Sequence, residues 1–115
     1  ERDHVRRMVE MCHQHGLLAV LDDGGVQGFI AAVKGPLLGN SSVLTGTELA
    51  WWVNEDYRKG RNGLKLVRHL ENEARKQGVK YWNMIAMESS MPEEVGRLYE
   101  MMGYIHTESS YTKVL

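Results

Sequence analysis

The spacing of apolar residues predicts a helix followed by several strands in the first half of the chain. Apolar residues recur at helical intervals up to Cys12, and Gly16 is a typical helix stop, so we expect a helix that ends at His15. The apolar runs that follow predict three strands. They span residues 17–22, 26–33 and 43–54, with a turn between the first two and a loop at 34–42. The first two strands are expected to form a hairpin.

Helical spacing returns in the second half, over residues 63–77, and Gly78 follows as the expected stop. The apolar residues that mark the buried face of this helix are Leu66, Val67, Leu70 and Ala74. A fourth strand is expected at residues 79–87. A strand, a helix and a strand in this order imply a parallel crossover connection, which is normally right-handed.

The remaining residues predict one more helix and one more extended segment. Ser90 and Glu93 have the spacing of a capping box, and the helix that they begin is expected to end near Met102. Residues 103–115 are expected to be extended, as one bent strand or a short hairpin. This order predicts one α/β domain over residues 1–115, of the mixed α+β type, with a mostly antiparallel sheet and helices on its faces.

Composition and charge exclude some functions. The net charge of −1 disfavours a nucleic-acid binder that works by general electrostatics. A single cysteine, Cys12, cannot form a disulfide within the chain, so a reducing, cytoplasmic setting is the simplest interpretation. No apolar run approaches the ~20 residues that span a bilayer, and His13 and His15 lack a third ligand, so neither a membrane partner nor a metal is expected. Because the chain does not begin with Met, we expect residues upstream of Glu1 to be missing from it.

Cations gather where the second helix begins. Arg58, Lys59 and Arg61 lie among Gly60 and Gly63, and no acid follows within the first turns of the helix. Backbone N–H groups at a helix N-terminus carry partial positive charge, and glycines let a ligand come close, so the segment has the chemistry of a phosphate site. It is neither a Walker loop nor a dinucleotide fingerprint. The local residues alone leave open an ordinary turn with solvated cations.

The segment WVNEDYRKGRNGLKL resembles the coenzyme A segment of the GCN5-related N-acetyltransferases (GNAT), in which Arg/Gln-x-x-Gly-x-Gly/Ala opens a helix. Arg58 matches the first position of that pattern and Gly63 the last. Arg61 stands where the middle glycine is usual, with Gly60 beside it. The segments RLYEMMGY and VQGFIAA also resemble the family. The resemblance covers nearly the whole chain except the family's first strand, and it is closest to compact bacteriophage and bacterial members.

The resemblance implies a GNAT-like fold in which two parallel strands, ending near Val53 and Met87, separate to admit acetyl-CoA. It implies acetyl-CoA as the co-substrate and no metal. Val53 is implied to offer backbone hydrogen bonds to the pantetheine arm. The residues implied at the pyrophosphate are Arg58, Lys59, Gly60, Arg61, Asn62 and Gly63. Pro92 stands where the family often has an asparagine, so Ser89 or Ser90 is the implied substitute.

The resemblance also implies two catalytic residues. Tyr99 matches the family's acid tyrosine. A phenol with a pKa near ~10 stays protonated at neutral pH, so it can protonate a thiolate. The alternative role of Tyr99 is packing. Glu48 is the candidate base, and strand alternation places it on one face with Ala50 and Trp52, unless a bulge at Gly46 changes the faces. The alternative for Glu48 is a solvated carboxylate at an edge.

The chain is therefore interpreted as an N-acetyltransferase that passes the acetyl group of acetyl-CoA to an amine by direct attack. The implied partner is an amine-bearing acceptor, either a small molecule or a protein, and a homodimer is left open. The loop at 34–42 and the first helix are expected to shape the acceptor site. The alternative is a catalytically inactive CoA-binding or protein-interaction module of the same fold.

Overall fold

The computed structural model of the chain describes residues 2–86 and 92–115. The chain forms two compact units, Glu1–Ile85 and Ala86–Leu115. The elements, in chain order, are α1 (Arg2–His15), β1 (Leu17–Asp22), β2 (Val26–Leu37), β3 (Asn40–Val53), the 3-10 helix η1 (Glu55–Tyr57), α2 (Asn62–Lys76), β4 (Val79–Asn83) and α3 (Pro92–Met101).

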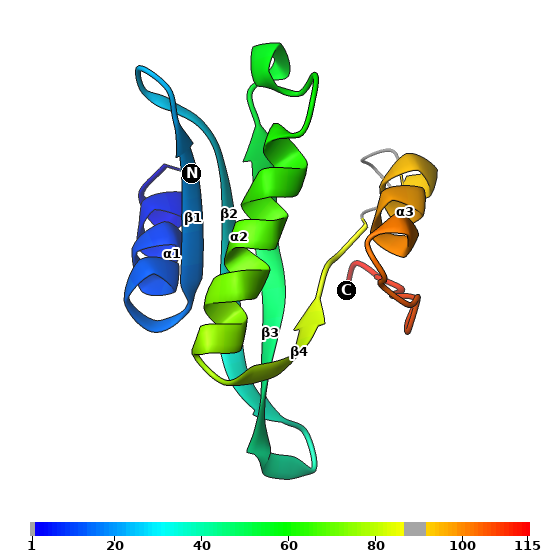
Figure 1. Ribbon diagram of the computed structural model, residues 1–115. Helices are drawn as coiled ribbons and strands as arrows, with labels where there is room; N and C mark the ends of the chain where they lie inside the picture. The colour runs from blue at the N-terminus through cyan, green and yellow to red at the C-terminus, as the bar shows by residue number, and fades with distance from the viewer. Residues whose placement is uncertain (1, 87–91) are drawn as a thin grey trace. The chain divides into compact units, whose positions relative to one another are not determined.

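The first unit is built on a mixed sheet of four strands in the order β1-β2-β3-β4. Neighbouring strands pair antiparallel from β1 to β3, whereas β3 and β4 pair parallel. Figure 1 shows α2 lying along the sheet, and α2 contacts all four strands, while α1 packs against β1 and β2. The predicted mixed sheet, with its first hairpin and its parallel crossover through α2, is therefore confirmed.

The core of the first unit lies between α2 and the sheet. The residues predicted to form the apolar face of α2 are the four that are buried, with Val67 and Leu70 fully enclosed. Across from α2, Ile30 of β2 is also fully buried. Burial of each such aliphatic side chain contributes roughly 1.5–3 kcal/mol to folding. Cys12 of α1 is also fully buried, as expected from its place in the helical spacing of apolar residues.

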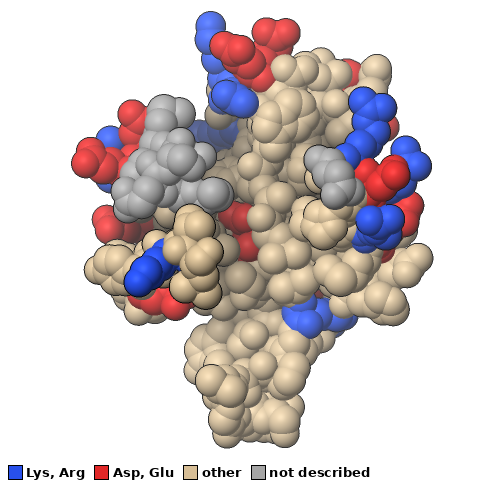
Figure 2. All heavy atoms as spheres, turned by 180° about the vertical axis from the view of Figure 1, so that it is seen from behind, with Lys and Arg blue, Asp and Glu red and all other residues tan. Residues whose placement is uncertain are grey.

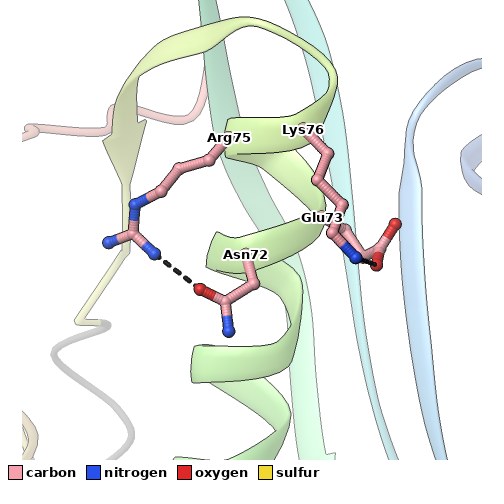
Figure 3. A network of polar contacts seen from close by, with 4 residues as sticks. All are labelled: Asn72, Glu73, Arg75 and Lys76. Carbon is pink, nitrogen blue, oxygen red and sulfur yellow. Dashed lines mark hydrogen bonds and ion pairs between the residues drawn. The ribbon is translucent and has the colours of Figure 1, made fainter.

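The C-terminal end of α2 has polar interactions suited to a helix end (Figure 3). Arg75 Nη1 donates a hydrogen bond of 2.7 Å to Asn72 Oδ1, and Lys76 Nζ lies 3.3 Å from Glu73 Oε1. Cations in the last turn interact favourably with the partial negative charge of the helix C-terminus. Gly78 then adopts φ 84°, which a glycine reaches without steric cost, so the helix stops where the sequence predicted.

The predicted loop at 34–42 is wrong, because both neighbouring strands continue through it. β2 runs to Leu37 and β3 begins at Asn40, with Gly39 at φ 88° in the tight turn between them. β1 pairs with β2 only as far as Ala32, so the part of β2 that contains Pro36 has one neighbouring strand and tolerates a residue with no N–H. Residues 35–47 carry no charge, and this end of the hairpin is drawn without blue or red in Figure 2.

Two predictions for the C-terminal part need correction. The fourth strand ends at Asn83 rather than at 87, because β3 no longer pairs with it beyond that point; Met87 lies outside the described residues. Residues 103–115 contain no strand, so the predicted strand or hairpin is wrong. An extended segment becomes a strand only when a neighbour accepts and donates its backbone hydrogen bonds. The apolar residues of this segment that are at least 84% exposed are Ile105, Tyr111, Val114 and Leu115.

The second unit contains α3, which ends close to the predicted residue. Gly103, at φ 92°, donates to the carbonyl of Glu100, and Tyr104 donates to the carbonyl of Tyr99. This pair of bonds is the Schellman motif, which satisfies the last carbonyls of a helix. Ser90, expected to cap the start of this helix, lies outside the described residues. In the part of the chain that the structure describes, no helix has both the length and the apolar character needed to cross a membrane.

Candidate active site

Side-chain hydrogen bonds hold the segment between β3 and α2. Tyr57, in η1, donates a hydrogen bond of 3.0 Å to Asp23 in the β1–β2 turn, and this bond together with nearby acids raises the pKa of the phenol. Asn62 Nδ2 in turn donates to the carbonyl of Tyr57 at 3.0 Å. The amide of Asn62, a residue predicted to contact the cofactor, thus fixes the loop in the ligand-free chain.

The backbone of this loop leaves the start of α2 open to an anion. Arg61 is the N-cap of α2 and makes no side-chain capping bond, and no acid occupies the first turn of the helix. Gly60 has φ 96°, and a Cβ built there meets nothing within 4 Å. Arg61 has φ −112°, which any residue adopts, so an arginine in the place of the family's middle glycine causes no backbone strain. Lys59 is exposed. These features fit the phosphate groups of a bound nucleotide cofactor.

Arg58 and Val53, predicted to act separately, are joined by a hydrogen bond. Arg58 Nε donates to the carbonyl oxygen of Val53 at 2.7 Å. The next N–H along the chain, that of Asn54 just after β3, donates to the carbonyl of Gln27 on β2. Because strand polar groups alternate in direction, those of Val53 point away from β2, toward the side of β3 that β4 has left. A carbonyl has two lone pairs, so Val53 retains one acceptor position and its N–H for a ligand.

Gly63 has a packing role that the sequence did not indicate. A Cβ built on Gly63 lies 3.2 Å from Cζ2 of Trp51, closer than nearly all real Cβ contacts. The absence of a side chain at this position therefore lets the start of α2 rest on the indole ring. Trp52 points to the opposite face of β3, is 42% exposed and lies with its ring centroid 6.4 Å from that of Phe29. Neighbouring residues of a strand point to opposite faces, so this separation of the two tryptophans follows from their place in β3.

The parallel strands separate next to Glu48. Their last pair is Thr47 with Asn83, and from Glu48 to Val53 β3 pairs with β2 but no longer with β4. A register irregularity at Leu49 places Glu48 opposite Ala32, whereas Ala50 is opposite Ala31. Neighbouring residues of β2 point to opposite faces.

The prediction that Glu48 shares a face with Ala50 and Trp52 is therefore wrong. The cause is a bulge in β3, which lies at Leu49 rather than at Gly46. Sequence alternation could not place it, because Leu49 fits a regular strand equally well.

The carboxylate of Glu48 has the environment of a base. Glu48 is 6% exposed, so it is not the solvated edge residue of the alternative interpretation. Burial raises the pKa of Glu48 above its ordinary value of 4.5, and a hydrogen bond from the Ile85 backbone N–H opposes part of that rise. A carboxylate with a raised pKa accepts a proton more readily than an ordinary one, which suits proton transfer.

Tyr99 belongs to the second unit and is described within it. It is 7% exposed, and its ring centroid lies 5.6 Å from that of Tyr104, so the ring is part of a packed aromatic pair at the end of α3. This packing does not decide between the two roles expected for the residue, since an acid tyrosine also needs a fixed ring. Ser89 and Ser90 lie outside the described residues.

Sequence reasoning missed the groups that contact Glu48 and its strand. The Ile85 N–H is a backbone group, and the type of residue does not predict that its N–H contacts a side chain. Asn83 Nδ2 donates to the carbonyl of Gly46 at 3.2 Å and lies 3.4 Å from Thr47 Oγ1. An asparagine inside an apolar strand was a usable signal, because this residue is disfavoured in strands. Among the described residues, no group of three or more His, Cys, Asp or Glu side chains is arranged to hold a metal ion.

Comparison with known proteins connects this geometry to one family. The profile of the acetyltransferase (GNAT) family matches residues 1–104. No curated protein sequence matches the chain. Glucosamine-6-phosphate N-acetyltransferase from Arabidopsis thaliana has a TM-score of 0.77 at 14% identity, over 99% of this chain and 78% of that one.

Two further structures share the fold. An aminoglycoside acetyltransferase from an uncultured soil metagenomic sample has a TM-score of 0.74 at 15% identity, over 100% of this chain and 74% of that one. Ribosomal-protein-alanine N-acetyltransferase from Brucella melitensis has a TM-score of 0.68 at 22% identity, over 83% of this chain and 65% of that one. At such identities these likenesses show the fold alone.

Proposed function

Because the chain belongs to the acetyltransferase (GNAT) family, we propose that it transfers the acetyl group of acetyl-CoA to an amine of an acceptor. The observation that carries this proposal is the buried Glu48 carboxylate at the point where β3 and β4 separate. From Glu48 the unpaired edge of β3 runs five residues to Val53, about 17 Å of extended strand, which an extended pantetheine arm covers. The loop before α2 begins at the far end of that edge.

The residues proposed to hold acetyl-CoA follow from this arrangement. The N–H groups at the start of α2, with Gly60 and the cations Arg58, Lys59 and Arg61, are suited to the pyrophosphate. The outward N–H of Val53 is suited to an amide oxygen of the pantetheine arm. When bound, acetyl-CoA supplies an activated acetyl thioester for attack by the acceptor amine.

The chain's own residues then handle two protons. The Glu48 carboxylate accepts a proton from the acceptor's ammonium group, directly or through one water, so that the amine has a free electron pair. The Tyr99 hydroxyl donates a proton to the thiolate that leaves. Neither residue becomes covalently bonded to the acetyl group, which agrees with direct attack.

The acceptor is not set by the fold. Proteins that share it are named for acetylating an amino sugar phosphate, an aminoglycoside and a ribosomal protein. The proposal for this chain therefore stops at an amine-bearing acceptor, either a small molecule or a protein.

A thiol-release assay tests the proposal. The chain is incubated with acetyl-CoA and a panel of amino sugars, aminoglycosides, polyamines and peptide N-termini, and both the free thiol and the acetylated product are measured. We expect thiol release that depends on one class of amine and is lost in Glu48→Gln. Binding of CoA without acetylation of any amine would favour the alternative, an inactive CoA-binding or interaction module.

A further inference from the structure

Asn83 joins the two parallel strands at the last position where they pair. It is the final residue of β4 and lies opposite Thr47 of β3. Its side-chain Nδ2 donates to the carbonyl of Gly46 at 3.2 Å and lies within 3.4 Å of Thr47 Oγ1. An exposed asparagine thus supplies a link between strands just before they diverge, where backbone pairing is about to end.

The next link between the same strands is made by Glu48. This residue follows Thr47 on β3, and its carboxylate accepts the N–H of Ile85, two residues after Asn83. The Glu48 carboxylate therefore accepts the Ile85 N–H at a point where the backbone of β3 no longer pairs with this segment. The position of the Ile85 N–H depends on where β4 is held, and the asparagine link is the last one that holds it.

We propose that Asn83 is a positioning residue that keeps the Ile85 N–H on the Glu48 carboxylate by fixing the end of β4 against Gly46 and Thr47. The proposal that this carboxylate is the general base rests on the proposed function. The coupling between Asn83 and Glu48 does not, because it concerns the ligand-free chain and can be measured without turnover.

The effect of the Asn83 link on the pKa of Glu48 has one expected direction. A hydrogen bond to a carboxylate stabilises the charged form, so the Ile85 N–H lowers the pKa of Glu48 while burial raises it. If the end of β4 is loosened, the Ile85 N–H no longer lowers the pKa of Glu48, while burial of the carboxylate still raises it. Charged residues on the adjoining strands are engaged elsewhere: Lys34 of β2 donates to Gln77, and Lys80 of β4 lies over the Tyr81 ring. Loss of the asparagine link should therefore move the pKa of Glu48 upward.

The test is an NMR titration of the full chain without ligand. The glutamate carboxyl carbons are labelled with 13C, the Glu48 signal is identified by its loss in Glu48→Gln, and its pKa is compared between wild type, Asn83→Ala and Asn83→Thr. The threonine variant is included because β-branched residues suit a strand and preserve folding. Asn72→Ala is the matched control, since Asn72 makes an exposed side-chain hydrogen bond within α2, to Arg75 (Figure 3).

We expect the pKa of Glu48 to be higher than in the wild type in both Asn83 variants and unchanged in Asn72→Ala. Exchange of the Ile85 amide should be roughly 2- to 10-fold faster in the Asn83 variants, the change expected from weakening one hydrogen bond. An unchanged Glu48 pKa in a folded Asn83 variant would overturn the proposal.

Two further results also decide the matter. In the wild type, the Ile85 amide proton shift must follow the Glu48 titration, and an Ile85 signal indifferent to that titration would overturn the proposal even if no variant folds. Where thiol release is found, its acidic limb should move to higher pH in Asn83→Thr. Normal turnover with no change in the Glu48 pKa would remove the role of Asn83 and leave the acetyltransferase proposal intact.

Discussion

The backbone N–H of Ile85 donates a hydrogen bond to the carboxylate of Glu48 across the gap that opens between β4 and β3. This contact fixes a buried carboxylate in one place and limits how far its pKa rises. It also explains how the chain tolerates a nearly enclosed acid, because a buried charge without a hydrogen-bonding partner costs several kcal/mol. The same carboxylate is the proposed base, so its removal should affect activity and stability in opposite directions.

Glu48→Gln should lower turnover by ~10²–10⁴-fold, the usual contribution of a positioned base, and barely change CoA affinity. Its effect on stability should depend on pH. Burial raises the pKa of Glu48 in the folded chain above the ordinary 4.5, so the folded state holds the proton more tightly than the unfolded state does. The stability contributed by this group is therefore complete below the ordinary value and is lost as the pH rises through the raised one.

Denaturant unfolding at several pH values checks this expectation. The difference in unfolding free energy between Glu48→Gln and wild type should move in favour of the variant as the pH is raised from below the ordinary value of 4.5. Glu10→Gln, an exposed substitution on α1, is the control. A difference for Glu48→Gln that stays constant with pH would contradict the burial of an ionisable carboxylate.

Arg58→Ala should weaken CoA binding by about 1.5–3 kcal/mol, or roughly 10- to 150-fold, because it removes a cation and the link to the Val53 carbonyl. Isothermal titration measures the change. Arg75→Ala is the matched control: it also removes one arginine, but from the opposite end of α2, about 20 Å away along the helix. Equal losses in the two variants would mean that the effect is only one of net charge.

Gly63→Val should destabilise the fold by about 1–3 kcal/mol even without a ligand, since the new side chain must displace the Trp51 ring. The midpoint of urea unfolding, followed by tryptophan fluorescence, gives the size of the effect. Gly96→Ala serves as the control, because a Cβ at that position in α3 meets nothing within 4 Å. Its midpoint should be unchanged or higher. An unchanged midpoint for Gly63→Val would show that α2 does not rest on the indole.

Tyr99→Phe should reduce turnover by ~10²–10⁴-fold with little change in acetyl-CoA affinity or thermal stability, because it removes a proton donor and keeps the ring that packs on Tyr104. Tyr104→Phe makes the same chemical change on the other member of the pair. Steady-state kinetics of both variants separates the two roles. Similar turnover in the two variants and in the wild type would leave Tyr99 as a packing residue.

The sequence predicted the parts of the fold that depend on local periodicity. The buried face of α2 could be read from the spacing of Leu66, Val67, Leu70 and Ala74, and the stop at Gly78 from its need for a positive φ. The continuation of β2 and β3 through residues 34–42 was missed, because glycine and proline at positions 35 and 36 indicate a loop when the pairing of the strands is not known. Which side of β2 lacks a neighbour is a property of the assembled sheet, and local pattern does not contain it.

In the candidate site, too, the features that depend on local sequence were predicted and those that depend on strand pairing were not. The loop from Arg58 to Gly63 was found from its charge and glycine content, and Glu48 from its place in an apolar strand. The bulge at Leu49, the Asn83 link and the Ile85 N–H were not found, because each depends on the register between strands distant in sequence. The bond between Arg58 and Val53 was missed for a related reason, since each residue was considered only as a contact for the cofactor.

Calorimetric titration of the chain with CoA, and separately with pantetheine, tests the central claim most directly, because it needs no knowledge of the acceptor. Pantetheine has the thiol arm of CoA but lacks the pyrophosphate that the start of α2 is proposed to hold. We expect a dissociation constant in the micromolar range for CoA and binding at least roughly 10-fold weaker for pantetheine, with a smaller difference in Arg58→Ala. Equal affinity for the two compounds, or no binding of CoA by the folded chain, would contradict that claim.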